Sequence, residues 1–218
     1  GKWHLGEEII HNWFDVAAGY AVSDYLAWCE EHGISDGWPL QDPDVRSHRK
    51  PPMSIPVTKV QEVAPEETND AWIADIAIRQ IEERPKDRPF FVSCGFNGPH
   101  PPFKIPEPYF SMYDPSQIPE PENFRPGSGE PEYKERSFYR RLWKDHGEEW
   151  ERWRKAVAVY WGFATLIDDQ IGRIVATLET EGVRKNTVVI FCSDHGEMLG
   201  QHGLWHKMQP YEESLRVP

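Results

Sequence analysis

Two short, almost continuously apolar runs constrain the fold of this chain more than any other feature. They are residues 89–94 (PFFVSC) and 187–192 (TVVIFC), each bounded by turn-forming residues. A run that is apolar at successive positions predicts a parallel strand buried on both faces, because one solvated face would require alternation. Each run follows a segment with helical periodicity. The resulting order, helix–strand–helix–strand, predicts an α/β fold with a mainly parallel central sheet flanked by helices.

Both helices are indicated by apolar residues three or four positions apart. The first has Asn69 or Asp70 as its N-cap and Pro85 just past its end. The second is longer, extends from Trp150 to Leu178 and is predicted to stop at Gly182.

Length and charge narrow the classes of protein to consider. A chain of 218 residues is enough for one sizeable domain or a large part of one. The net charge of −12 argues against a general nucleic-acid binder, and no apolar run approaches the ~20 residues of a membrane span. The chain opens on Gly1 rather than Met and closes on Pro218, so we expect a fragment that is incomplete at both ends. Its compartment is left open.

Two irregular stretches, residues 36–56 and 99–131, interrupt the regular pattern. The second holds ten prolines and several aromatic residues. Loops of this kind on a rigid α/β scaffold usually shape a binding site, so both are predicted to lie over the active site.

Polar residues follow both apolar runs, where an open α/β sheet places its ligands. His100 comes after the first run, and Asp194, His195 and Lys207 come after the second. A carboxylate and an imidazole leaving one strand can bind the same divalent metal. Taken alone, however, a helix-capping Asp beside an exposed His is the simpler interpretation.

Four motifs, in the expected order, resemble the sulfatase family of the alkaline phosphatase-like superfamily. They are residues 1–6 (GKWHLG), 94–103 (CGFNGPHPPF), 108–115 (PYFSMYDP), and 193–200 with 203–207 (SDHGEMLG and GLWHK). The resemblance spans the whole chain and implies an enzyme that hydrolyses sulfate monoesters of small molecules or carbohydrates.

The resemblance also implies the roles of single residues. Lys2 binds a sulfate oxygen, and His4 hydrogen-bonds the nucleophile. His100 lies beside the ester oxygen and assists the leaving group, while Lys207 contacts both the sulfate and that oxygen. Cations placed at these points stabilise the charge that develops as the ester bond breaks.

The same family pattern implies a metal and a modified residue. Asp194 and His195 are the expected metal ligands, with calcium as first choice and manganese or zinc as alternatives. The nucleophile is a formylglycine made from a Cys or Ser in a C/S-x-P-x-R motif, which none of Cys29, Cys94 and Cys192 begins. We therefore expect that motif upstream, together with a maturation enzyme such as a formylglycine-generating enzyme. A smaller C-terminal domain is expected beyond residue 218, and the fragment alone is expected to be inactive.

Two other functions stay open. One is a phosphonate monoester or phosphodiester hydrolase of the same superfamily, and the other is a pseudoenzyme that binds anions without a nucleophile. Within the proline-rich stretch, Phe103 and Lys104 are predicted to lie nearest the substrate, and residues 109–113 to pack back on the domain. His202 and His206 are interpreted as exposed loop histidines.

Overall fold

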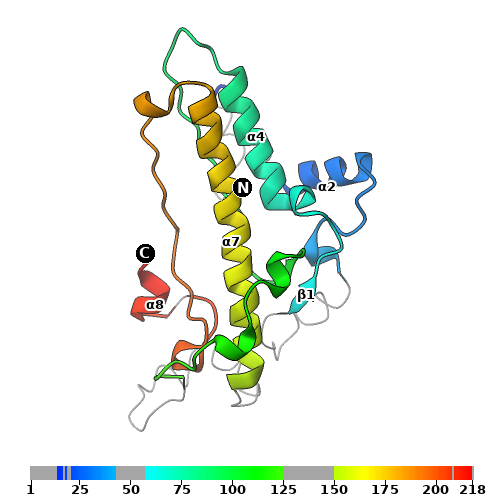
Figure 1. The fold of residues 1–218 in the computed structure, drawn as a ribbon, viewed down its shortest axis with the longest axis vertical. Helices are drawn as coiled ribbons and strands as arrows, with labels where there is room; N and C mark the ends of the chain where they lie inside the picture. The colour runs from blue at the N-terminus through cyan, green and yellow to red at the C-terminus, as the bar shows by residue number, and fades with distance from the viewer. Residues whose placement is uncertain are drawn as a thin grey trace.

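The computed structural model describes residues 14–16, 18, 21–42, 57–124, 150–207 and 209–217. They combine helices with a short two-stranded parallel sheet in an α/β arrangement, joined by 3-10 turns (Figure 1). Its regular elements are helices α2 (Val22–Glu31), α4 (Asn69–Glu83), α7 (Trp150–Thr180) and α8 (Glu212–Leu215), and strands β1 (Thr58–Val60) and β2 (Phe103–Ile105).

Helix α7 is the long element around which the rest is arranged (Figure 1). Its apolar face contributes most of the largest core cluster, including Trp153, Val157, Phe163 and Leu166, which are at most 8% exposed. The helix ends as predicted near Gly182, whose φ of +70° is accessible to glycine at little cost. The 3.6-residue periodicity of the sequence is therefore confirmed as a real buried face.

Helix α4 packs along α7, and its N-cap lies one residue before Asn69, the first of the two predicted caps. Its N-cap is Thr68, whose side-chain oxygen accepts a hydrogen bond from the N–H of Ala71 at 3.3 Å. Asn69 and Asp70 lie in the first turn instead, and both are buried. This leaves their side chains available for contacts outside the helix.

The sheet is parallel as predicted, but different residues form it. Strands β1 and β2 pair in the register Thr58–Phe103, Lys59–Lys104 and Val60–Ile105. Residues 89–94 and 187–192 are extended, yet neither belongs to a ladder. A strand needs a hydrogen-bonding neighbour, and within the described ranges the chain supplies none beside these two segments.

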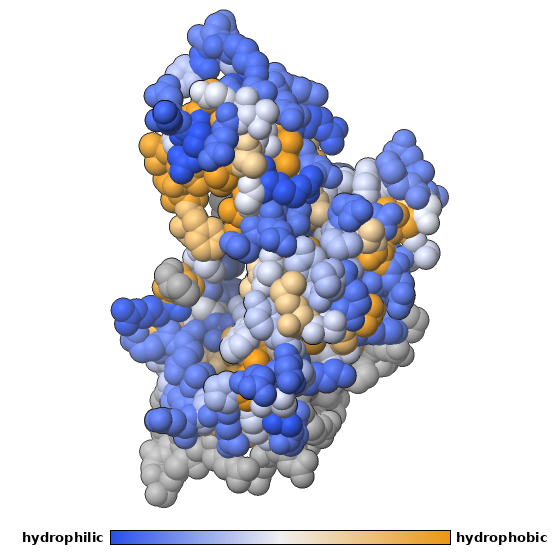
Figure 2. All heavy atoms as spheres, viewed as in Figure 1, coloured by the Kyte–Doolittle hydropathy of each residue, from blue (hydrophilic) through white to orange (hydrophobic). Residues whose placement is uncertain are grey.

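The unpaired segments expose the side chains that were predicted to be buried. Phe91, Val188 and Ile190 are 78%, 86% and 82% exposed. Figure 2 shows hydrophobic side chains gathered on the same side of the molecule as the extended segment that follows α7. The prediction of two strands buried on both faces is therefore wrong for this arrangement of the chain.

Candidate active site

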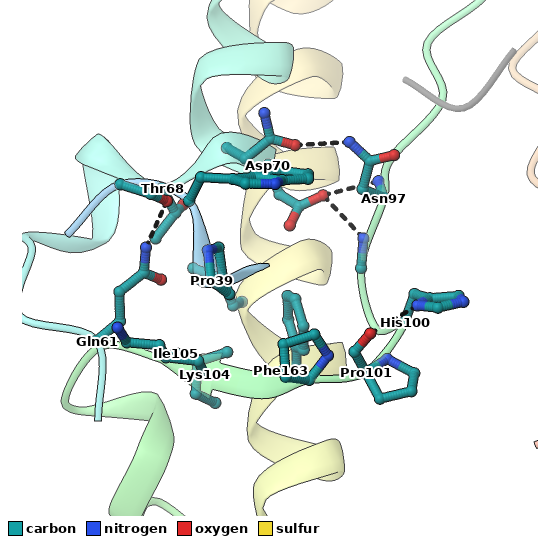
Figure 3. Close-up of a pocket in the computed structure, with 16 residues that line it drawn as sticks. Pro39, Gln61, Thr68, Asp70, Asn97, His100, Pro101, Lys104, Ile105 and Phe163 are labelled. Atoms are coloured by element: carbon teal, nitrogen blue, oxygen red, sulfur yellow. Dashed lines mark hydrogen bonds between the residues drawn. The ribbon is translucent and has the colours of Figure 1, made fainter. Parts of the chain in front are cut away.

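His100 lies on a loop that is hydrogen-bonded to the first turn of helix α4. The carboxylate Oδ1 of Asp70 accepts hydrogen bonds from the backbone N–H groups of Asn97 and Gly98, at 3.0 and 3.1 Å (Figure 3). The side-chain Nδ2 of Asn97 donates to Oδ1 of Asn69 at 2.7 Å. The first turn of α4 therefore fixes the backbone two residues before His100.

Asp70 is almost fully buried beneath this loop. Burial raises the pKa of its carboxyl group, and the two backbone N–H donors act in the opposite direction. Such a carboxylate is expensive to bury unless it has hydrogen-bond partners. The sequence pattern predicted Asp70 only as a possible helix cap and did not predict its contact with the loop that carries His100.

The loop formed by residues 197–207 folds back on itself through two backbone hydrogen bonds. The N–H of Gly200 donates to the carbonyl of Leu204 at 2.9 Å, and that of Met198 to the carbonyl of His206 at 3.0 Å. Trp205 anchors the loop in the core, stacked on Trp153 with ring centroids 5.2 Å apart. Its neighbours His206 and Lys207 are thereby held at a fixed place.

Three of the chain's basic side chains gather around His206. The imidazole rings of His100 and His206 lie 6.2 Å apart between centroids. Burial, together with the positive charges of Lys207, His100 and His195, lowers the pKa of His206 to about 4. Residues from segments about a hundred positions apart thus share one electrostatic environment.

Glu197 is the acidic member of this group. It accepts a hydrogen bond from the backbone N–H of His206. Burial raises its pKa to about 7, while that hydrogen bond and the charge of Lys207 oppose the shift. The carboxyl group therefore ties the two ends of the 197–207 loop together. Neither Glu197 nor His206 was assigned a role from the sequence, and His206 is partly buried rather than exposed.

Asp194 and His195, the two predicted metal ligands, have side chains that lie next to each other. The Nε2 atom of His195 lies 3.5 Å from Oδ2 of Asp194. The Nδ1 atom of the same ring is 2.7 Å from the carbonyl of Gly196, a contact that assigns the proton to Nδ1 and leaves the Nε2 lone pair for a metal. The pair fits part of a metal site. Among the described residues, no group of three or more His, Cys, Asp or Glu side chains completes it.

Phe103 and Lys104 do not have the positions predicted for substrate contacts. Phe103 is fully buried in β2, and the Lys104 side chain is only 2% exposed. The Lys104 ammonium contacts the carboxylates of Asp36 and Asp42, the latter at 2.8 Å. A cation removed from water needs such partners, so the Lys104 ammonium anchors the 36–42 segment and its charge is already used by these two carboxylates.

Other predicted positions divide between the described and undescribed parts of the chain. Residues 109–113 pack back on α7 as predicted: the Tyr109 hydroxyl donates to Asp169 at 2.6 Å, and that of Tyr113 lies 2.9 Å from Thr165 Oγ1. Lys2 and His4 lie outside the described residues, as do residues 43–56 and 125–131 of the two predicted loops.

None of the described helices combines the length and the apolarity that a membrane-spanning helix needs.

Comparison with known proteins gives consistent matches. A family model described as Sulfatase matches residues 6–218. An arylsulfatase of Clostridium perfringens is 35% identical over 156 residues, covering 67% of this chain and 30% of that protein. The multifunctional alkaline phosphatase superfamily protein PehA of Trinickia caryophylli is 31% identical over 218 residues, covering 90% of this chain and 40% of PehA.

The fold also has a counterpart among solved structures. A phosphonate monoester hydrolase from Silicibacter pomeroyi superimposes with a TM-score of 0.65 at 25% identity, over 87% of this chain and 39% of that one. The chain thus spans well under half the length of the proteins it matches. Because the family model covers nearly every residue, the chain belongs to the sulfatase family.

Proposed function

We propose that the protein containing this chain hydrolyses sulfate monoesters. The observation that carries the proposal is the gathering of His100, His195 and Lys207 around His206. A sulfate ester presents several anionic oxygens, and it needs positive charge or a proton at its leaving oxygen. Because the chain has a net charge of −12, a local cluster of basic side chains is a stronger indication of an anion-binding site.

Each residue of the proposed anion site has a role in binding the sulfate or in releasing the alcohol. Lys207 binds a sulfate oxygen and the bridging oxygen. His100, in its protonated form, gives a proton to the alcohol oxygen as the bond to sulfur breaks. Lys2 and His4 complete the anion site. The chain supplies the binding and leaving-group side of the reaction.

The proposed reaction also needs a metal ion and a nucleophile, in addition to the residues named above. Asp194 and His195 would hold one divalent cation, with calcium as first choice and manganese or zinc as alternatives, and the metal would supply positive charge to the sulfate oxygens. The nucleophile is a formylglycine in another part of the longer protein, produced by a maturation enzyme. In this proposal residues 1–218 are the part of the catalytic domain that lies between the nucleophile segment and a smaller C-terminal domain.

A second function has a specific observation in its favour. The matched fold belongs to a phosphonate monoester hydrolase, and the metal pair contains His195, a nitrogen ligand that suits softer cations than calcium. A phosphonate monoester or phosphodiester offers the same anionic oxygens to Lys207. Hydrolysis of phosphonate esters is therefore the alternative activity.

The test compares two esters of one alcohol in the full-length protein. Phenyl sulfate and phenyl methylphosphonate differ only in the group attached to the phenolic oxygen. Faster turnover of the sulfate supports the main proposal, and faster turnover of the phosphonate supports the alternative. No turnover of either ester, in protein with its formylglycine verified by mass spectrometry, contradicts both.

Two substitutions assign the residues. Lys207→Ala is expected to lower kcat/KM by about a hundredfold or more, as removal of a transition-state contact does. Lys185→Ala, which changes an exposed lysine outside the site, is the control and leaves kcat/KM unchanged. Asp194→Asn is expected to lower the bound metal measured by elemental analysis. Wild-type metal content in that variant would remove Asp194 from the metal site.

A further inference from the structure

A cavity of about 180 Å³ opens beside His100, on the side of the loop that faces helix α4 (Figure 3). Its walls come from residues 37–39, the first turn of α4, the 97–102 loop, β2 and the middle of α7. Trp38, Pro39, Ile105, Phe163 and Leu166 make most of the lining apolar. A cavity of roughly 150 Å³ with apolar walls holds one benzene ring, so this one has room for a single six-membered ring.

Most polar groups in the walls are already paired with one another. The Lys104 ammonium contacts two aspartates, and the Gln61 amide donates to the carbonyls of Asp36 and Gly37 at 2.9 and 2.8 Å. The Asn69 carbonyl oxygen accepts from Asn97. These groups shape the cavity but have little left to offer a ligand.

Asp70 differs from them. Both hydrogen bonds to its carboxylate use Oδ1, and among the described residues none reaches Oδ2. The residue is 4% exposed, and its second oxygen points into the cavity (Figure 3). Among the described residues Oδ2 is not one of the fully buried atoms that lack a partner, which agrees with an oxygen that faces the cavity. A carboxylate oxygen in these largely apolar surroundings gains strongly from a donor.

We propose that this cavity binds the alcohol part of the substrate and selects a ring-sized apolar alcohol with one O–H or N–H group that donates to Asp70. The inference rests on the proposed function, in which His100 stands beside the bridging oxygen. Since His100 also lines the cavity, an alcohol leaving on that side enters it directly. The apolar walls then bury the ring, and the Asp70 carboxylate accepts a hydrogen bond from the O–H or N–H group of the alcohol.

The test uses two sulfate esters of nearly equal intrinsic reactivity. 3-Hydroxyphenyl sulfate offers a donor, whereas 3-methoxyphenyl sulfate offers only an acceptor at the same ring position. In the full-length protein, kcat/KM is expected to favour the hydroxyl ester by about 10- to 100-fold, as a hydrogen bond to a buried charged group allows. A ratio near one overturns the proposal.

Asp70→Asn separates recognition from a purely structural role. The amide oxygen can still accept from Asn97 and Gly98, but its NH₂ group then faces the cavity and donates. The preference is expected to reverse toward the methoxy ester. If the variant slows both esters equally, Asp70 only supports the loop and the proposal is wrong. Asp75→Asn is the matched control, since Asp75 lies on the same helix and pairs with Arg173 away from the cavity.

Binding of the free alcohols keeps this inference separate from the proposed activity. If no sulfate ester is hydrolysed, the proposed function fails, and calorimetry with resorcinol and 3-methoxyphenol still tests the cavity. Resorcinol is expected to bind about tenfold or more tightly to the wild type, with the order reversed in Asp70→Asn. Equal affinities of the two phenols would refute the cavity's selectivity.

Discussion

Gly98→Ala should damage the candidate site through a single added methyl group. An ideal Cβ at this position lies 2.4 and 2.7 Å from two ring carbons of Phe163 and 2.9 Å from the Cδ1 atom of Ile167. Carbon atoms in contact normally stand about 3.5–4.0 Å apart, so the loop or the ring must move by about 1 Å. The loop cannot withdraw without lengthening the hydrogen bond from Gly98 to Asp70.

The size of the effect follows from this geometry. Overpacking of a well-filled core costs about 1–3 kcal/mol of folding stability. His100 is two residues away, and a shift of about 1 Å in a catalytic group can reduce turnover by about a hundredfold. We therefore expect a lower urea midpoint together with a kcat for phenyl sulfate that falls far more than the loss of stability alone would cause.

The assay pairs urea unfolding with kcat in the full-length protein. Gly172→Ala is the control, because a Cβ there meets nothing within 4 Å and alanine is favoured over glycine inside a helix. The Gly172→Ala variant should gain about 0.5–1 kcal/mol of folding stability and keep its kcat. Adding Phe163→Leu to Gly98→Ala makes room for the methyl group and should recover part of both losses. Strict additivity of the two substitutions, or a fully active Gly98→Ala, would refute the reasoning.

Two further predictions concern buried charge. Lys104→Met should lower the free energy of unfolding by about 3–5 kcal/mol, because it leaves Asp36 and Asp42 without their buried cation. Lys59→Met, at a side chain 43% exposed, should lower it by at most about 1 kcal/mol in the same unfolding assay. Equal losses in the two variants would contradict the pairing. The pKa of His206 falls to about 4 on folding. Between pH 6.5 and pH 4 the unfolded chain therefore takes up a proton that the folded chain does not. The folding stability present above pH 6.5 is lost as the pH falls through this range. His206→Asn, which suits the φ of +67° at this position, should make that loss shallower by about 2–3 kcal/mol, and an unchanged pH profile would show that another group causes it.

The sequence predicts those features that depend on neighbours in the chain. Helix α7 follows from its periodicity, because a helix makes its hydrogen bonds internally. Residues 187–192 show the limit of this reasoning. Their apolar character indicates that they can be buried, but only a partner strand can bury them, and local sequence does not reveal whether one is at hand.

The candidate site shows the same division. His100, His195 and Lys207 were predicted as site residues from motifs, and the structure brings them together around His206. Lys104 was misplaced because its two aspartates lie 62 and 68 positions away, and no local pattern connects them. Asp70 was interpreted as a helix cap for a similar reason, since the N–H groups it receives come from a loop 27 residues further along.

Helix α7 also decides where this domain can change length during evolution. Phe163 supports the loop that carries His100, and Trp153 supports the loop that carries Lys207. Ten residues of helix, at a rise of about 1.5 Å each, separate the two supports by about 15 Å. One inserted residue between them would rotate one support by about 100° relative to the other and point it away from its loop. Insertions that alter specificity should therefore accumulate in the connecting loops, while the spacing between positions 153 and 163 stays fixed among functional descendants of this chain.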